Sequence, residues 1–252
     1  MILATGTALP SVIAVACGGG SSHPSPPPAG YTGEVRLERY HTYLPAAPVS
    51  PFLFAQIDFQ APPPSNQYLQ AGAALTLTGP AGSIRLTEHN AFGKLVYQPD
   101  QNLGDLPLSL WVPDSDYTAQ GTGSGANGGV PAFDFAPALH TPGPLEILSP
   151  DVGPGQIAVN ASSDLELSWT AGDGDYIFVI FAVASGGSGS YLEYRVADDG
   201  SFPVPQSGLA TLPVGVGSLT MERVIERPLT LPDGGTGTGY GGDAITVRLV
   251  RE

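Results

Sequence analysis

The sequence predicts an all-β chain, organised as two tandem β-sandwich domains. Short apolar runs with strand-like alternation recur along the chain, and Gly and Pro separate them. No stretch shows the spacing of an amphipathic helix of useful length. The 252 residues fit one or two domains, and an apolar share of 42% is enough for a buried core.

Gly and Pro are unusually frequent, with 34 and 26 residues, and charged residues are scarce at 13%. Such a composition approaches that of disordered chains, but disordered chains lack repeated apolar runs. The composition therefore indicates β-rich domains with many turns.

The formal net charge is -14, and Lys94 is the only lysine. Because nucleic-acid affinity comes largely from Lys and Arg neutralising phosphates, we expect no nucleic-acid partner. The same deficit argues against a polybasic membrane-binding patch.

Cys17 is the only cysteine, so an intrachain disulfide is impossible. It follows the apolar run Val12–Ala16 and precedes Gly18–Ser22, the order of a secretory signal and its cleavage point. The stretch Ala14-Val15-Ala16-Cys17 resembles a bacterial lipobox, a resemblance that covers the first 17 residues. It implies a signal peptide over 1–16, cleavage before Cys17, and a diacylglyceryl group on that thiol.

The lipobox resemblance has two departures. Ala14 stands where the family prefers Leu, and the first seven residues contain no Lys or Arg, which puts the assigned start codon in doubt. No later run has the ~20 apolar residues of a membrane span, so the lipid would be the membrane attachment. Gly18 after the cysteine implies sorting to the outer membrane, where the chain would face the periplasm or the cell surface. Residues 17–33 form the expected disordered Pro/Gly/Ser tether.

The first sandwich is expected at 34–142. Its predicted strands are 35–40, 52–59, 73–78, 83–87, 94–98, 106–112 and 130–135, and 118–129 is expected to be a long Gly-rich loop. Trp111 alternates with Leu110 in the sixth strand, so one of the two should be exposed.

The second sandwich is expected at 143–252, after a Pro- and Gly-marked boundary at 140–144. Its predicted strands are 145–148, 156–160, 164–169, 176–183, 191–196, 219–225 and 244–250, with one helical turn at 207–212. Seven short strands in this length are typical of an immunoglobulin-like sandwich. Leu165, Leu167 and Trp169 alternate and should face the core.

This second half also resembles an element that recurs in secreted myxobacterial proteins. The resemblance spans about 90 residues and rests on the segments 164–169, 174–177, 197–205, 209–213 and 217–220. It implies an immunoglobulin-like or fibronectin-like fold and supplies no catalytic residues. Tyr194 stands near the position where such copies often carry a Cys.

Two segments, Gly123–Gly128 and Gly237–Gly242, match the G-x-G-x-x-G pattern of dinucleotide sites. Each leads into a predicted strand, whereas a dinucleotide site needs a following helix. We therefore expect both to be flexible loops.

Catalytic and metal motifs are missing from the sequence. His23, His41, His89 and His140 form no H-x-x-x-H pair, no G-x-S-x-G elbow occurs, and the histidines are expected on the surface or in the tether. The sequence thus predicts no enzyme, no catalytic residue, no metal ligand and no cofactor. A triad assembled from distant residues remains an alternative.

Three acidic pairs keep a calcium alternative open, at Asp114/Asp116, Asp173/Asp175 and Asp198/Asp199. Asp and Gly are also the usual turn residues. Aromatic residues offer weaker hints of a sugar platform: Trp111, and the group Tyr40, His41 and Tyr43. Trp169 is expected in the core.

The function expected from these features is that of a non-enzymatic, lipid-anchored cell-envelope protein with a structural or adhesive role. Its partners would be the membrane, through the lipid, and an envelope protein or polysaccharide. The alternative is a carbohydrate-binding module, with calcium dependence as an option.

Overall fold

The computed structural model describes residues 27–45, 50–91, 93–100, 105–124, 128–185 and 188–252. The expected signal peptide, Cys17, His23 and most of the tether lie outside these residues. The described chain is almost entirely β-structure, so the all-β prediction is confirmed. Its strands are β1 (Thr32–Tyr43), β2 (Ser50–Gln60), β3 (Ala74–Gly79), β4 (Gly82–Ala91), β5 (Lys94–Gln98), β6 (Ser115–Gly121), β7 (Phe133–Thr141), β8 (Ile147–Ser149), β9 (Gln156–Val159), β10 (Leu165–Trp169), β11 (Tyr176–Ser185), β12 (Ser188–Val196), β13 (Ser201–Val204), β14 (Gly215–Thr230) and β15 (Thr236–Arg251).

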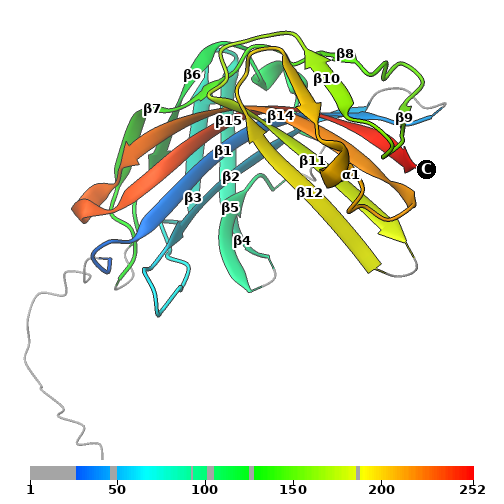
Figure 1. Ribbon diagram of the computed structural model, residues 1–252. Coiled ribbons are helices and arrows are strands. Elements are labelled where there is room, and N and C mark those ends of the chain that lie inside the picture. The colour runs from blue at the N-terminus through cyan, green and yellow to red at the C-terminus, as the bar shows by residue number, and fades with distance from the viewer. Residues whose placement is uncertain (1–26, 46–49, 92, 101–104, 125–127, 186–187) are drawn as a thin grey trace, which may run out of the picture.

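Twelve strands form one large sheet in the order β12-β11-β14-β15-β1-β2-β5-β4-β3-β6-β7, with β9 paired to the end of β15. A three-stranded sheet, β13-β10-β8, lies over the C-terminal part of the large sheet (Figure 1). Short helical segments are η1 (Leu108–Leu110), α1 (Gln206–Leu209) and η2 (Pro232–Gly234).

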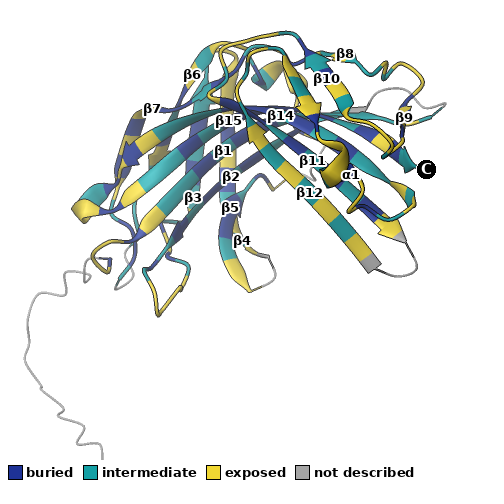
Figure 2. Cartoon of the chain, viewed as in Figure 1, coloured by how far each residue is buried: buried dark blue, intermediate teal, exposed yellow. Residues whose placement is uncertain are grey.

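The C-terminal half has the strand arrangement of an immunoglobulin-type sandwich. The sheet β13-β10-β8 packs against β12-β11-β14-β15, and β9 runs parallel to the last four residues of β15. The core between the sheets contains Leu167 and Trp169, as their alternation predicted. Residues along β11 alternate between this core and the opposite face, which gives the striped burial seen in Figure 2.

The N-terminal half is closed by β7, which returns across β14, β15 and β1. Gly239 and Gly241 of β15 make this close approach possible, because an added Cβ there would overlap the carbonyl oxygens of Ala138 and His140. The core of this half contains apolar residues of β1, β2, β3 and β4, and also Leu229 and Leu231 from the C-terminal half.

The two halves share their longest strands. β14 and β15 are 16 residues each, and β1 pairs in parallel with twelve residues of β15. One part of each long strand contributes to the C-terminal core and the other part lies beneath β7. The division at 142/143 stays a prediction, and the sequence did not anticipate that one sheet would run through both halves.

Three local predictions are wrong. Residues 106–112 are not a strand but contain η1, since Pro107 and Pro113 lack the N–H groups that a strand ladder needs. The expected loop at 118–129 begins only after β6, where Tyr117 and Ala119 alternate inward between polar residues. The segment Gly237–Gly242 is no loop, because it lies inside β15, where its glycines admit β7.

Candidate functional site

The large sheet has one face that carries neither hydrophobic core, which we call the open face. Both core clusters lie on the opposite face of β1, β2, β11, β14 and β15, which we call the covered face. The described chain places no second sheet over the open face. Its central side chains are Glu34, Arg36, Glu38 and Tyr40 on β1; Phe52, Phe54, Gln56 and Asp58 on β2; Phe178, Ile180, Glu193 and Arg195 on β11 and β12; and Glu222, Val224, Glu226 and Tyr240 on β14 and β15.

Carboxylates meet at the centre of the open face. Glu38 is 4% exposed, receives a hydrogen bond of 3.2 Å from Arg36 and one of 2.5 Å from the hydroxyl of Tyr40. Glu222 approaches from β14, and both carboxyl side chains lie over Gly242, where a Cβ would collide with Glu222 Oε1 and approach Glu38 Cγ to 3.0 Å. The missing side chain at Gly242 is therefore what admits the pair.

The carboxyl group of Glu222 has a raised pKa. Burial raises its pKa to about 8, and the negative charge of Glu38 adds to this effect, which Arg36 opposes. Burial also raises the pKa of Asp58 and of Glu34 on the same face. The open face therefore carries several carboxyl groups whose pKa values burial raises, and a carboxyl group in its protonated form can donate a hydrogen bond.

Aromatic rings surround this centre. Tyr40 and Phe52 stack with their ring centres 4.9 Å apart, and the guanidinium of Arg36 lies 4.9 Å from the ring centre of Tyr240. Gln56 donates to Asp58 at 2.8 Å and accepts from Gln98 at 2.9 Å. A small hollow of about 140 Å³ is lined by Arg36, Glu38, Phe178, Ile180, Glu193, Glu222, Val224 and Tyr240.

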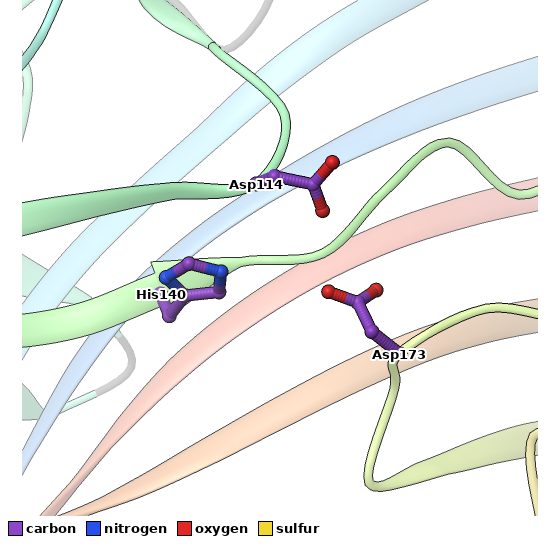
Figure 3. A group of neighbouring side chains, drawn as sticks. All are labelled: Asp114, His140 and Asp173. Atoms are coloured by element: carbon purple, nitrogen blue, oxygen red, sulfur yellow. The ribbon is translucent and has the colours of Figure 1, made fainter.

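A second polar cluster lies where the two halves meet. Asp114, His140 and Asp173 bring three potential metal-ligand atoms within 4.8 Å of one another, and their side chains point toward a common space in Figure 3. His140 Nδ1 lies 2.8 Å from Asp116 Oδ1, so Nε2 is the nitrogen left for a ligand. Asp173 Oδ1 accepts from the backbone of Gly143 at 3.3 Å. These three residues could hold a divalent ion, and water would have to supply the remaining ligands.

The third acidic pair has a structural role. Asp198 is buried and accepts from Arg223 at 2.7 and 3.1 Å, from the indole of Trp169 at 2.8 Å, and from Gly174 at 2.9 Å. Arg223 also donates to the carbonyls of Gly143, Pro144 and Thr170. The interpretation of this pair as a calcium loop is therefore wrong for Asp198.

Only one of the predictions about aromatic residues is confirmed, the burial of Trp169 in the core. The expectation that either Leu110 or Trp111 would be exposed is wrong, because Trp111 is buried, at 4% exposure, and Leu110 is partly buried against the same core as Trp111. Tyr40, His41 and Tyr43 form no common platform, because only Tyr40 faces the open side. Other aromatic rings do gather on the open face, where Tyr40 stacks on Phe52 and Arg36 lies over Tyr240.

The histidines were expected on the surface or in the tether. His41 instead lies beside the buried Asp243, with Nε2 and Oδ1 3.7 Å apart. His89 is 3.7 Å from Asp100 at the surface, and His140 belongs to the Asp114 cluster.

Comparison with known proteins does not identify a family for this chain. No family model and no curated protein matches the chain. Among solved structures, it aligns with a tetra-tandem repeat from the extending region of a large adhesion protein, at 15% identity over 85% of this chain and 50% of that one. The TM-score is 0.21, too low to indicate a shared fold.

No helix in the described part of the chain is long and apolar enough to cross a membrane.

Proposed function

We propose that this chain is a non-enzymatic binding protein of the bacterial cell envelope, with a structural or adhesive role, and that the open face is its binding surface. The observation that carries the proposal is the open face itself. It spans several strands, lies opposite both cores, and combines aromatic rings with carboxyl, amide and guanidinium groups.

A neutral polysaccharide is the partner that this chemistry fits best. Sugar rings present C–H faces that pack on aromatic rings, and their hydroxyl groups bond to carboxyl groups such as that of Asp58 and to amides such as that of Gln56, both of which are half-buried on this face. The ionised carboxylates disfavour an anionic glycan, because Arg36 is already engaged by Glu34 and Glu38. This supports the carbohydrate-binding alternative without requiring a bound ion.

Lipid attachment at Cys17 would hold this surface at a membrane. Its expected signature is a mature chain that begins at Cys17 with added acyl mass, lost when signal peptidase II is inhibited. An unmodified chain that retains residue 1 in intact-mass spectrometry would contradict it.

The binding surface is tested with a panel of neutral polysaccharides in affinity electrophoresis, followed by calorimetry on any that retards the chain. Tyr240→Ala and Gln56→Ala should each raise Kd by about tenfold, equivalent to ~1.4 kcal/mol. Leu148→Ala is the control, because Leu148 is 61% exposed on β8, in the three-stranded sheet on the other side of the C-terminal core.

Two outcomes would overturn the glycan partner. One is that no polysaccharide of the panel retards the chain. The other is that Leu148→Ala weakens binding as much as Tyr240→Ala, which would move the contact away from the open face.

A further inference from the structure

The large sheet ends in two strands that are protected very differently. At one end, β7 contains Pro137, has an irregular register with β6, and packs back on β14 and β15. At the other end, β12 pairs with β11 on one side, and the described chain places no strand on its other side. An unpaired edge exposes N–H and C=O groups that can pair with another strand.

β12 lacks several of the features that usually block such pairing, although it carries the charged side chains of Glu193 and Arg195. It is nine residues long, contains neither Pro nor Lys, and keeps a continuous register with β11. Tyr191 near its start is 75% exposed. The edge is therefore long and regular enough to accept a partner strand.

The sequence of β12 is complementary to itself. If two copies pair antiparallel around Tyr194, Glu193 of one copy lies opposite Arg195 of the other, and the symmetry creates this pair twice. Both residues are exposed on the open face, and the Arg195 side chain is 56% exposed. On the covered face, Leu192 lies opposite Val196, and both are half-buried at the rim of the C-terminal core.

Neighbouring registers are unfavourable. A pairing centred on Glu193 or on Arg195 places like charges directly opposite each other. A shift by a single residue places Glu193 beside Val196, so that the charged face of one copy continues into the apolar face of the other.

We propose that β12 is a self-association edge, through which two copies of this chain pair antiparallel around Tyr194 and join their large sheets into one. The interface is isologous, as expected for a two-fold dimer. The occupant is a second copy, because the alternating charge and apolar pattern complements its own sequence.

Charge reversal tests this register. In sedimentation equilibrium, the unaltered chain should dimerise, whereas Glu193→Arg and Arg195→Glu should each be monomeric at the same concentration. An equimolar mixture of the two variants should form a heterodimer, since each then faces opposite charges, and the double variant should dimerise again. Glu166→Arg is the control, because Glu166 is an exposed carboxylate on β10, away from this edge.

Disulfide trapping provides a readout that tolerates some loss of stability. Tyr194→Cys should crosslink two copies through residue 194 in a glutathione redox buffer, as identified by peptide mass spectrometry. Leu148→Cys, at a position that is more exposed than Tyr194, with 61% exposure of the native side chain, should not yield the corresponding self-linked peptide. A monomeric unaltered chain, or a Glu193→Arg variant that dimerises as well as the unaltered chain, would overturn the proposal.

Discussion

The two faces of β14, β15 and β1 differ in how their charged side chains are arranged. On the covered face, Arg223, Asp243 and Arg39 lie in one row across the three strands. On the open face, the adjacent residues Glu222 and Glu38 bring two carboxyl groups together. Residues next to each other in sequence thus belong to different electrostatic environments.

On the covered face, the buried charges are matched by hydrogen bonds. Asp243 is fully buried and accepts from Arg39 at 2.8 and 2.9 Å and from the backbone of Leu145 at 2.8 Å. The guanidinium of Arg223 donates hydrogen bonds to the backbone carbonyls of Gly143 and Pro144, which fixes this segment against β14. On the open face, burial and the neighbouring charge of Glu38 raise the pKa of Glu222, which favours its protonated form beside Glu38. The difference indicates that the charged residues of the covered face maintain the structure.

The largest expected effect comes from removing a charge from the row of Arg223, Asp243 and Arg39 on the covered face, which we call the covered row. Arg223→Ala leaves Asp198 buried without its guanidinium and should lower the free energy of unfolding by about 3–5 kcal/mol, measured by urea denaturation. Arg227→Ala, four residues along β14, removes only the exposed pair with Asp116 and should cost at most about 1 kcal/mol. Equal losses in the two variants would refute the assignment of a structural role to the row.

A smaller loss of stability should distinguish the two faces when alanine replaces Gly241, which faces the covered side, or Gly242, which faces the open side. Gly241→Ala places a Cβ against the backbone of β7 and should cost about 1–3 kcal/mol of unfolding free energy. Gly242→Ala meets the side chains of Glu222 and Glu38, which can move, and should cost about 1 kcal/mol or less. The measurement is again urea denaturation, and the reverse order would contradict the described contact with β7.

The smallest effect concerns pH. Because the pKa of Glu222 is raised in the folded state, from 4.5 to about 8, the folded chain holds a proton that the unfolded chain has lost between these values. This contribution to stability is therefore complete below about pH 4.5 and is lost as pH rises through about 8.

Glu222→Gln removes this titration. Relative to the unaltered chain, the variant should gain about 1–2 kcal/mol of unfolding free energy between pH 5 and pH 8.5, a figure reduced for partial solvent exposure. Parallel urea titrations at several pH values measure it. A constant difference between the two proteins would exclude a raised pKa at Glu222.

The strand pattern was largely predictable because period-two alternation is local. Leu167 and Trp169 were placed in the core correctly, and the helical turn expected at 207–212 overlaps α1. The glycines of β15 were misassigned, because a glycine that admits a crossing strand has the same sequence signature as one in a loop. The open face was not identified either, since its residues come from six strands that are distributed along the whole described sequence.

By itself, the sequence determined the all-β class, most strand positions, the acidic surface and the expected lipid-attachment signal, because each depends on composition or on local spacing. Only the tertiary structure decided that β14 and β15 would serve both halves. It also decided that Glu38 and Glu222 would meet over Gly242, and that β12 would remain an open edge. These features depend on which strands pair across long sequence separations, and a local hydrophobic pattern fixes the face of a strand but not its neighbour.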